Sequence, residues 1–451
     1  MRSNLAAAAI TWVLVSTSAG APKPPAVRPL GRIERVSTDS LASAAAALPM
    51  PGGRVLVNDI TSRRVLMFDS TLAHATLIAD STSATASAYG RNAGTLISYR
   101  KDTALFIDPA SLSMLVIGPT GAIARVMAIP RPDDGQYLIG SVFGTPGFDA
   151  RGRLAYFGRG GLRGTFILCC LGTSRRGDLL TMGEDPGAQA SSQRVPKPDS
   201  AFVVRVDLES RVLDSAVAFR IHNDRQSVNY DAQGFTRSIE TTPNPLPIVD
   251  VWAMLPDGSM AVVRGRDYHV DWLDTAGHWT STPKLPFDWQ RVDDERKLAL
   301  IDSAVTVEQA AVDLYNGPRP DLPAAAGGNA GGSGGRGGGG GGVSRGGGAG
   351  RGGRQPIPLV VGRAEPGELP DYMPPFTEGA LYPDAEGNLW IRTSTMVRGQ
   401  PVYDLVNRRG ELFDRVQLPP FRTIAGFGPG IVYMAVKDAG GMVHLERARV
   451  R

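Results

Sequence analysis

The sequence is poor in cysteine and, beyond its first residues, has no long apolar run. Two cysteines in 451 residues exclude a disulfide framework and a cysteine-rich zinc site. No run after the N-terminus approaches the ~18 residues of a spanning helix, so we expect no membrane span in the mature chain. Charge of one sign is not in excess either. Outside residues 1–21 and 327–354, 43 basic residues oppose 44 acidic ones, so nucleic acid is not an expected partner.

Residues 1–21 have the layout of a secretory signal peptide. A short basic start precedes eleven mainly apolar residues, Leu5–Val15, and small residues follow. This run is too short to span a bilayer and matches the apolar part of a signal peptide. We expect cleavage after Ala19 or Ala21 and a periplasmic or secreted mature chain, residues 22–451.

The rest of the chain repeats a short unit: a glycine turn, a strand of alternating apolar residues, and a second apolar strand that ends in a polar turn. The clearest copy covers residues 53–69, and a copy with the same 16-residue spacing covers 258–274. Each indicates a hairpin of period-2 strands. A strand at 31–36 would complete the last sheet and close a ring without exposed edges. The remaining units cover 103–118, 152–207, 387–407 and 430–445.

The 53–69 unit resembles the repeat of six-bladed β-propellers of the NHL and TolB-like type. Those repeats have a Gly-x-apolar-x-Val-x-Asp strand followed by an arginine and an apolar pair. The resemblance implies an all-β fold in which residues 22–451 form a single six-bladed β-propeller. It implies little about function, because propellers host many functions. The matching residues are Gly53, Val55, Val57, Asp59, Arg63 or Arg64, Val65 and Phe68.

Two insertions are expected in the ring. The first, residues 165–200, is expected to form a hairpin or loop. It contains Cys169 and Cys170, which would point to opposite faces of a strand. Buried thiols are therefore favoured over a strained vicinal disulfide. The second insertion covers residues 292–370.

The second insertion combines a helix with a glycine-rich loop. Apolar residues recur at a helical period over residues 293–315. Residues 327–353 contain 18 glycines in 27 positions, so we expect a disordered loop there. The helix either packs on the ring or forms a lid over the central funnel.

The most suggestive polar stretch for a ligand site is Asp267–Trp272. On a strand, Asp267, His269 and Asp271 share one face, and Trp272 lies on the other. Three such side chains span about 13 Å, which is too far for all of them to bind one ion. We therefore expect Asp267, His269, Asp271 and Trp272 to line a ligand site, with a solvated sheet face as the alternative.

The main functional hypothesis is an exported propeller without catalysis. It would be a monomer without cofactor that binds a peptide, a glycan or an envelope protein through its loops. The alternative is a metal-dependent hydrolase or lactonase. Resemblance to six-bladed lactonases of the gluconolactonase type implies Ca²⁺ held by carboxylates and asparagines in the central funnel. The candidate ligands are Asn58, Asn92, Asn229, Asn388, Asp59 and Asp267.

Overall fold

The computed structural model describes residues 24–81, 88–158, 192–195, 199–222, 224–233, 235–316 and 357–450. Three predictions lie outside the described residues: the signal peptide, the state of Cys169 and Cys170, and the disordered loop at 327–353. Within the described part, no helix is long and apolar enough to cross a membrane.

Antiparallel sheets dominate the described chain, which has one α-helix, three short 3₁₀ turns and seven sheets. Sheets 1 to 3 each consist of four strands that pair in chain order. Sheet 1 has β3 (Ala46–Pro49), β4 (Val55–Asp59), β5 (Arg64–Phe68) and β6 (Ala75–Ala79). Sheet 2 has β7 (Thr95–Ser98), β8 (Ala104–Asp108), β9 (Ser113–Ile117) and β10 (Ile123–Ala128). Sheet 3 has β11 (Gly147–Phe148), β12 (Leu154–Gly158), β14 (Ser200–Val206) and β15 (Leu213–Arg220).

Sheets 4 to 6 follow the same plan, and the N-terminal strands complete the last two. Sheet 4 has β18 (Asp250–Met254), β19 (Met260–Arg264), β20 (His269–Leu273) and β21 (Trp279–Ser281). Sheet 5 has β23 (Phe376–Pro383), β24 (Leu389–Val397), β25 (Gln400–Val406) and β26 (Leu412–Gln417), with β1 (Val27–Pro29) outside β26. Sheet 6 has β27 (Arg422–Gly428), β28 (Ile431–Lys437) and β29 (Val443–Arg449), with β2 (Ile33–Val36) outside β29.

Sheet 1 shows how the sequence encodes one unit. Gly52 and Gly53 adopt φ of 75° and 76° in the turn from β3 to β4, a backbone that glycine tolerates without strain. All five residues of β4 are buried, because neighbouring sheets cover both of its faces. Asp59 ends the strand, accepts a hydrogen bond from the Ser43 amide and pairs with Arg64 at 2.8 Å. The carboxylate thus ties the β4–β5 turn to the loop before β3.

Sheets 1 to 6 follow one another around a common centre. Their first strands lie innermost: β3 contacts β7 and β27, β11 contacts β7 and β18, and β18 contacts β23. Hydrophobic clusters join successive sheets. Sheets 5 and 6, for example, meet where the rings of Trp390 and Phe427 lie 5.1 Å apart. Small sheets stacked radially in this way form a β-propeller.

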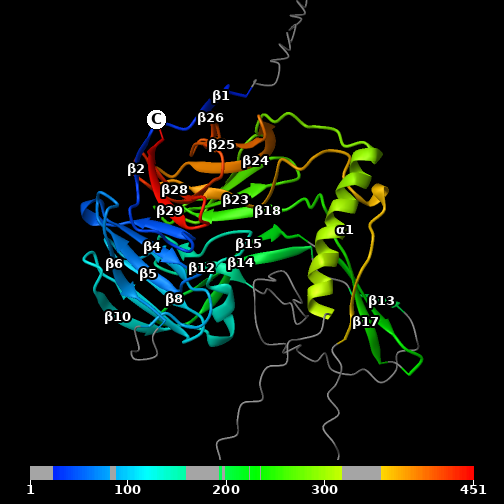
Figure 1. The fold of residues 1–451 in the computed structure, drawn as a ribbon, viewed down its shortest axis with the longest axis horizontal. Helices are drawn as coiled ribbons and strands as arrows, with labels where there is room; N and C mark the ends of the chain where they lie inside the picture. Colours follow the sequence, from blue (N-terminus) through cyan, green and yellow to red (C-terminus); the bar gives the residue numbers. More distant parts are fainter. Residues whose placement is uncertain are drawn as a thin grey trace, which may run out of the picture.

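Strands from the two ends of the chain close the last sheet. β2 pairs with β29 in antiparallel register, with Ile33 opposite Ala448, and Figure 1 shows the blue β2 beside the red β29. The predicted closing strand at 31–36 is therefore confirmed over Ile33–Val36. β1 runs parallel to β26, and Arg28 binds Asp414 at 2.6 Å, which fastens the N-terminal segment to sheet 5.

The seventh sheet, called the accessory sheet here, is mixed and pairs in the order β13-β16-β17-β22. Both predicted insertions and the segment between β15 and β18 contribute strands to it. The sequence predicts six sheets, and the structure has this additional one because three separate segments combine to form it. Its strands are β13 (Ser192–Val195), β16 (Arg225–Tyr230), β17 (Thr236–Thr242) and β22 (Leu359–Val361).

Helix α1 (Asp294–Asn316) confirms the predicted helix at 293–315. The Asp293 carboxylate accepts a hydrogen bond from the Arg296 amide at 2.9 Å, as a helix N-cap does. Ile301 is fully buried in a cluster with residues of the segment that returns to sheet 5. Lys297 is also buried and binds Asp371 of that segment at 2.8 Å. Figure 1 shows α1, β13 and β17 together on one side of the molecule; α1 and the accessory sheet are called the accessory unit below.

Candidate functional site

The structure brings together only part of the predicted ligand site. His269 and Asp271 share a face of β20, with His269 Nε2 and Asp271 Oδ1 3.3 Å apart. Trp272 lies buried on the opposite face, as predicted. Asp267 precedes the strand, because Tyr268 adopts a positive φ of 48°, and it pairs instead with Lys284 at 3.2 Å.

Asp271 belongs to an ion network between sheets 3 and 4. Arg264 binds Asp271 at 2.7 Å and Asp250 at 2.9 Å, and it donates to the carbonyl of Ala218 on β15. Burial raises the pKa of Asp271, but hydrogen bonds from Ser281 and Arg264 outweigh it and lower the pKa below its ordinary value. The network joins two sheets, and ligand binding at these residues stays a prediction.

The candidate Ca²⁺ ligands come from several different elements, and at least one of them is already engaged within the protein. Both polar atoms of the buried Asn58 side chain are engaged, by the Gly94 carbonyl and by the Tyr89 hydroxyl. The Asn58 side chain is therefore not available to bind Ca²⁺ in this conformation. In the described residues no group of three or more His, Cys, Asp or Glu side chains could hold a metal ion. The candidate ligands lie on β4 (Asn58, Asp59), before β7 (Asn92), on β16 (Asn229), in the β19–β20 connection (Asp267) and in the β23–β24 turn (Asn388).

A histidine held between two carboxylates forms a stronger candidate site. His222 Nε2 lies 2.7 Å from Asp224 Oδ1, and His222 Nδ1 lies 2.6 Å from Glu378 Oε1. The side chains are 20% exposed for His222 and 27% for each carboxylate. They are therefore desolvated enough to interact strongly and open enough to meet a ligand.

The electrostatics keep this histidine charged at neutral pH. Burial alone would lower the pKa of His222, but the hydrogen bonds with Asp224 and Glu378 outweigh it and raise the pKa to about 9. Glu308 of α1 is half-buried nearby. Its pKa is raised by burial and by the negative charge of Asp224. Asp224 therefore lies against an imidazolium, whereas Glu308 binds a proton more readily than an ordinary glutamate does.

The topology brings this site together from an inner strand of one sheet, the exit of an outer strand of another, and α1. Glu378 lies on β23, the innermost strand of sheet 5, within an irregularity in its pairing with β24. The next residue, Gly379, has φ of 68° and donates to the Val142 carbonyl at 2.5 Å. Bulges of this kind re-aim side chains, here toward His222. His222 itself follows the end of β15, and α1 supplies Glu308 from the accessory unit.

No sequence pattern singles out these residues. His222 and Asp224 are two positions apart, but Glu378 lies 156 residues away, and no local pattern links them. The only sequence signal is the short His-x-Asp spacing, which is common in loops.

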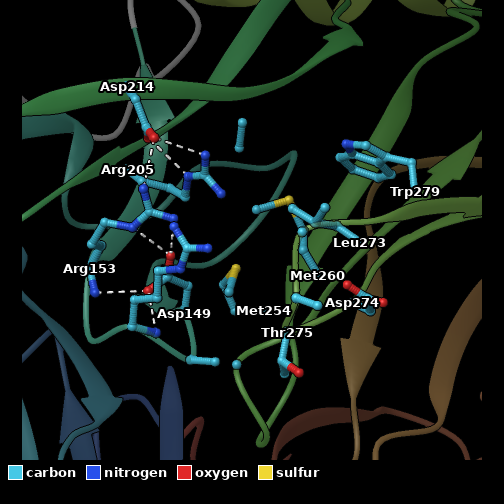
Figure 2. A pocket seen from close by; sticks show the side chains of 16 residues that line it. Asp149, Arg153, Arg205, Asp214, Met254, Met260, Leu273, Asp274, Thr275 and Trp279 are labelled. Carbon is cyan, nitrogen blue, oxygen red and sulfur yellow. Dashed lines mark hydrogen bonds and ion pairs between the residues drawn. The ribbon is translucent and has the colours of Figure 1, made fainter.

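A second candidate site is a pocket of about 310 Å³ between sheets 3 and 4. Figure 2 shows charged side chains on one wall, among them Arg153, Arg205 and Asp214. Met260 and Trp279 lie on the opposite wall, on sheet 4. The pocket opens at the end of the ring where the β11–β12 and β20–β21 turns lie, away from His222.

Comparison with known proteins finds only distant structural similarities. No protein-family model matches the sequence, and no curated protein is significantly similar to it. Virginiamycin B lyase from Staphylococcus aureus is 9% identical, with 93% of this chain and 99% of that chain covered and a TM-score of 0.36. A Bacteroides fragilis protein assigned as exported is 9% identical, covering 93% and 95%, with a TM-score of 0.42. A luciferin-regenerating enzyme is 11% identical, covering 92% and 96%, with a TM-score of 0.37.

These similarities overturn the prediction of a propeller without catalysis, because two of the three proteins are enzymes. The prediction relied on the lack of a local catalytic motif. Groups that meet at the centre of a propeller come from distant strands, so an active site there leaves no such motif. At 9 to 11% identity the likeness concerns the fold alone, and any activity must be argued from this chain's own side chains.

Proposed function

We propose that this chain is an exported six-bladed β-propeller of the NHL and TolB-like type that hydrolyses an uncharged ester or lactone. Sheets 1 to 6 are taken as the blades, because their inner strands surround one centre. The accessory sheet is excluded because its strands come from insertions and pair in a different order. Sequencing the N-terminus of the exported chain tests the export step, with a start at Gly20 or Pro22 expected.

One observation carries the proposed activity: Asp224 interacts with both the His222 imidazolium and Glu308. His222 contacts Asp224 at 2.7 Å, and the charge of Asp224 helps to raise the pKa of Glu308. A carboxylate beside an imidazolium and a second carboxyl group whose pKa is raised can supply a base and an acid to one reaction. Asp224, stabilised as an anion by His222, is assigned as the base, and Glu308 as the acid.

The reaction would use these groups in sequence. Asp224 removes a proton from water, and the water oxygen attacks the carbonyl carbon of the ester or lactone. The tetrahedral intermediate then collapses, the C–O bond to the leaving oxygen breaks, and Glu308 donates a proton to that oxygen. Exchange with solvent returns the proton from Asp224 to Glu308. His222 acts as a positioning residue, and Glu378 fixes it to the inner strand.

The charge of the site favours an uncharged substrate. His222 is the single cation among the four side chains, and both of its ring nitrogens already contact carboxylates. An anionic substrate would approach Asp224 and Glu378 against like charge, which is costly where groups are half-buried. Uncharged esters and lactones avoid this repulsion and still present a carbonyl to attack.

The test is a hydrolysis assay on the mature chain with a panel of uncharged aliphatic lactones and aryl esters. Glu308→Gln and Asp224→Asn should each lower kcat about 100- to 10,000-fold, as loss of a general acid or base does. Glu295→Gln, an exposed position on the same helix, is the matched control and should retain full activity.

Two results would reject the proposal. One is the absence of hydrolysis across the panel by the folded wild-type chain. The other is equal activity of the Glu308→Gln and Glu295→Gln variants. Circular dichroism melts of every variant distinguish a loss of catalysis from a loss of the fold. The His222→Gln variant should have a lower kcat, with Glu308 still in place.

A further inference from the structure

The pocket between sheets 3 and 4 lies at the opposite end of the ring from His222. Asp214 and Ala216 line it near the start of β15, whereas His222 follows the end of that strand. Eight residues of strand separate Asp214 from His222, roughly 25 Å. A ligand in this pocket would therefore not reach the proposed catalytic groups, and any binding there is a separate property of the protein.

The charged wall of the pocket is a closed ladder of ion pairs (Figure 2). Arg153 joins Asp149 and Asp214, each at 2.7 Å. Arg205 binds both oxygens of Asp214 at 2.9 Å. Burial raises the pKa of Asp214, but the contacts with Arg205 and Arg153 outweigh it and lower the pKa below its ordinary value. The Asp214 carboxylate therefore stays charged between its two arginine partners at neutral pH.

This ladder makes the pocket a poor site for an ion. Three arginines and three aspartates line it, so it has no net charge. An anion would have to compete with Asp214 for the guanidinium groups of Arg153 and Arg205. A cation that approached Asp214 would be repelled by the same two guanidinium groups. Breaking such pairs leaves charges without partners, at a substantial cost in binding free energy.

The pocket still offers hydrogen-bonding groups to an uncharged ligand. Within the described residues, Arg205 Nη1 donates no hydrogen bond, and the Arg205 side chain is 17% exposed. Asp274 is 54% exposed on the other side of the pocket, and Thr275 beside it is also exposed. Donors and acceptors thus face the cavity from two sides, as a ligand with several hydroxyl groups requires.

The remaining wall is apolar and ends in an aromatic ring. Met254, Met260 and Leu273 form its base, and Trp279 at its edge is 41% exposed. An exposed indole face packs well against the C–H face of a sugar ring, while the hydroxyl groups around that ring both donate and accept. We propose that this pocket binds an uncharged sugar, with one ring stacked on Trp279 and its hydroxyls bonded to Arg205, Asp274 and Thr275.

The size of the cavity limits the ligand to one or two rings. Its volume is about 310 Å³, at the lower end of the roughly 300–1,000 Å³ of ligand pockets. The turns that frame it are short, because Gly152 and Gly277 adopt φ of 77° and 99°. A Cβ at either glycine would meet nothing within 4 Å.

Saturation-transfer NMR of the mature chain tests this site with glucose, galactose, mannose, N-acetylglucosamine and cellobiose as probes. At least one should bind with a Kd on the order of 1 mM, the range expected for a small site with few polar contacts. Trp279→Ala should weaken that binding about tenfold or more, and Trp279→Phe should restore part of it.

Trp289→Ala is the matched control, since Trp289 is 40% exposed but lies outside the pocket. It should leave the Kd unchanged. The proposal is overturned if no sugar binds, if Trp279→Ala and Trp289→Ala bind alike, or if glucuronate or glucosamine binds better than the uncharged sugars. Ester hydrolysis by the Trp279→Ala variant should equal that of the wild type, so this test stands apart from the proposed activity.

Discussion

Raising the pH should remove a defined part of this protein's stability through His222. Its pKa is about 9 in the folded chain and 6.5 ordinarily. The folded state therefore binds the imidazole proton more tightly than the unfolded state. Such a group stabilises the fold fully below pH 6.5, and its contribution is lost as the pH rises through 9.

The magnitude follows from the two pKa values and the burial of the site. Each tenfold difference in proton affinity corresponds to about 1.4 kcal/mol, so the difference between the folded and the ordinary pKa of His222 corresponds to about 3 kcal/mol of unfolding free energy. About 1.4 kcal/mol of this should remain near pH 8 and almost none near pH 10. The His222 side chain is 20% exposed, so solvent screening reduces these values only in part.

Urea unfolding of the wild type and of His222→Gln at about pH 6, 8 and 10 measures the effect. The difference in unfolding free energy between the two chains should shrink by about 3 kcal/mol from the lowest to the highest pH. Other titrating groups cancel in this difference because both chains contain them. Parallel pH profiles, or an NMR titration that places His222 near its ordinary pKa, would refute the argument.

Three further predictions concern stability. Tyr268→Phe removes the hydroxyl that donates to the buried Asp404 at 2.7 Å, so urea unfolding should show a loss of about 1.5–3 kcal/mol. A loss well below this range would mean that water replaces the hydroxyl. Gly426→Ala places a Cβ 1.9 Å from the Ala47 carbonyl oxygen on the neighbouring inner strand, and should cost about 1–3 kcal/mol or more. Gly367→Ala, with nothing within 4 Å, should leave Tm unchanged. Excess Ca²⁺ or EDTA should give superimposable melts, and a clear rise in Tm with Ca²⁺ would contradict this expectation and show that the folded chain binds Ca²⁺.

The sequence was sufficient to predict the repeated sheets because their signals are local. The glycine turn and alternating residues of the 53–69 unit correspond to β4 and β5. The same pattern at 258–274 corresponds to β19 and β20. Closure by the strand at 31–36 was also predictable, since an exposed last edge needs a partner.

The accessory sheet and the His222 site could not be predicted in this way. β17 pairs with β22 although more than a hundred residues separate them, and β13 reaches β16 from the other insertion. Long-range pairing of this kind is decided by tertiary packing and has no period or turn signal of its own. The alternation of side chains along a strand correctly predicts that His269 and Asp271 share one face. It does not reveal that Arg264 pairs with Asp271 on that face.

The proposed active site and the accessory unit depend on one feature of the topology. In a sheet of four antiparallel strands, the connection between the second and third strands lies at the same end as the exit from the fourth. The segments that form the accessory sheet therefore all leave the ring at the end where His222 follows β15. The long connection from sheet 4 to sheet 5 brings α1, and Glu308 with it, beside Asp224. Insertions at this end can add chemical groups without altering the packing between sheets. Glu308→Gln should therefore lower kcat without lowering Tm, whereas Gly426→Ala, which disturbs the packing between inner strands, should lower Tm.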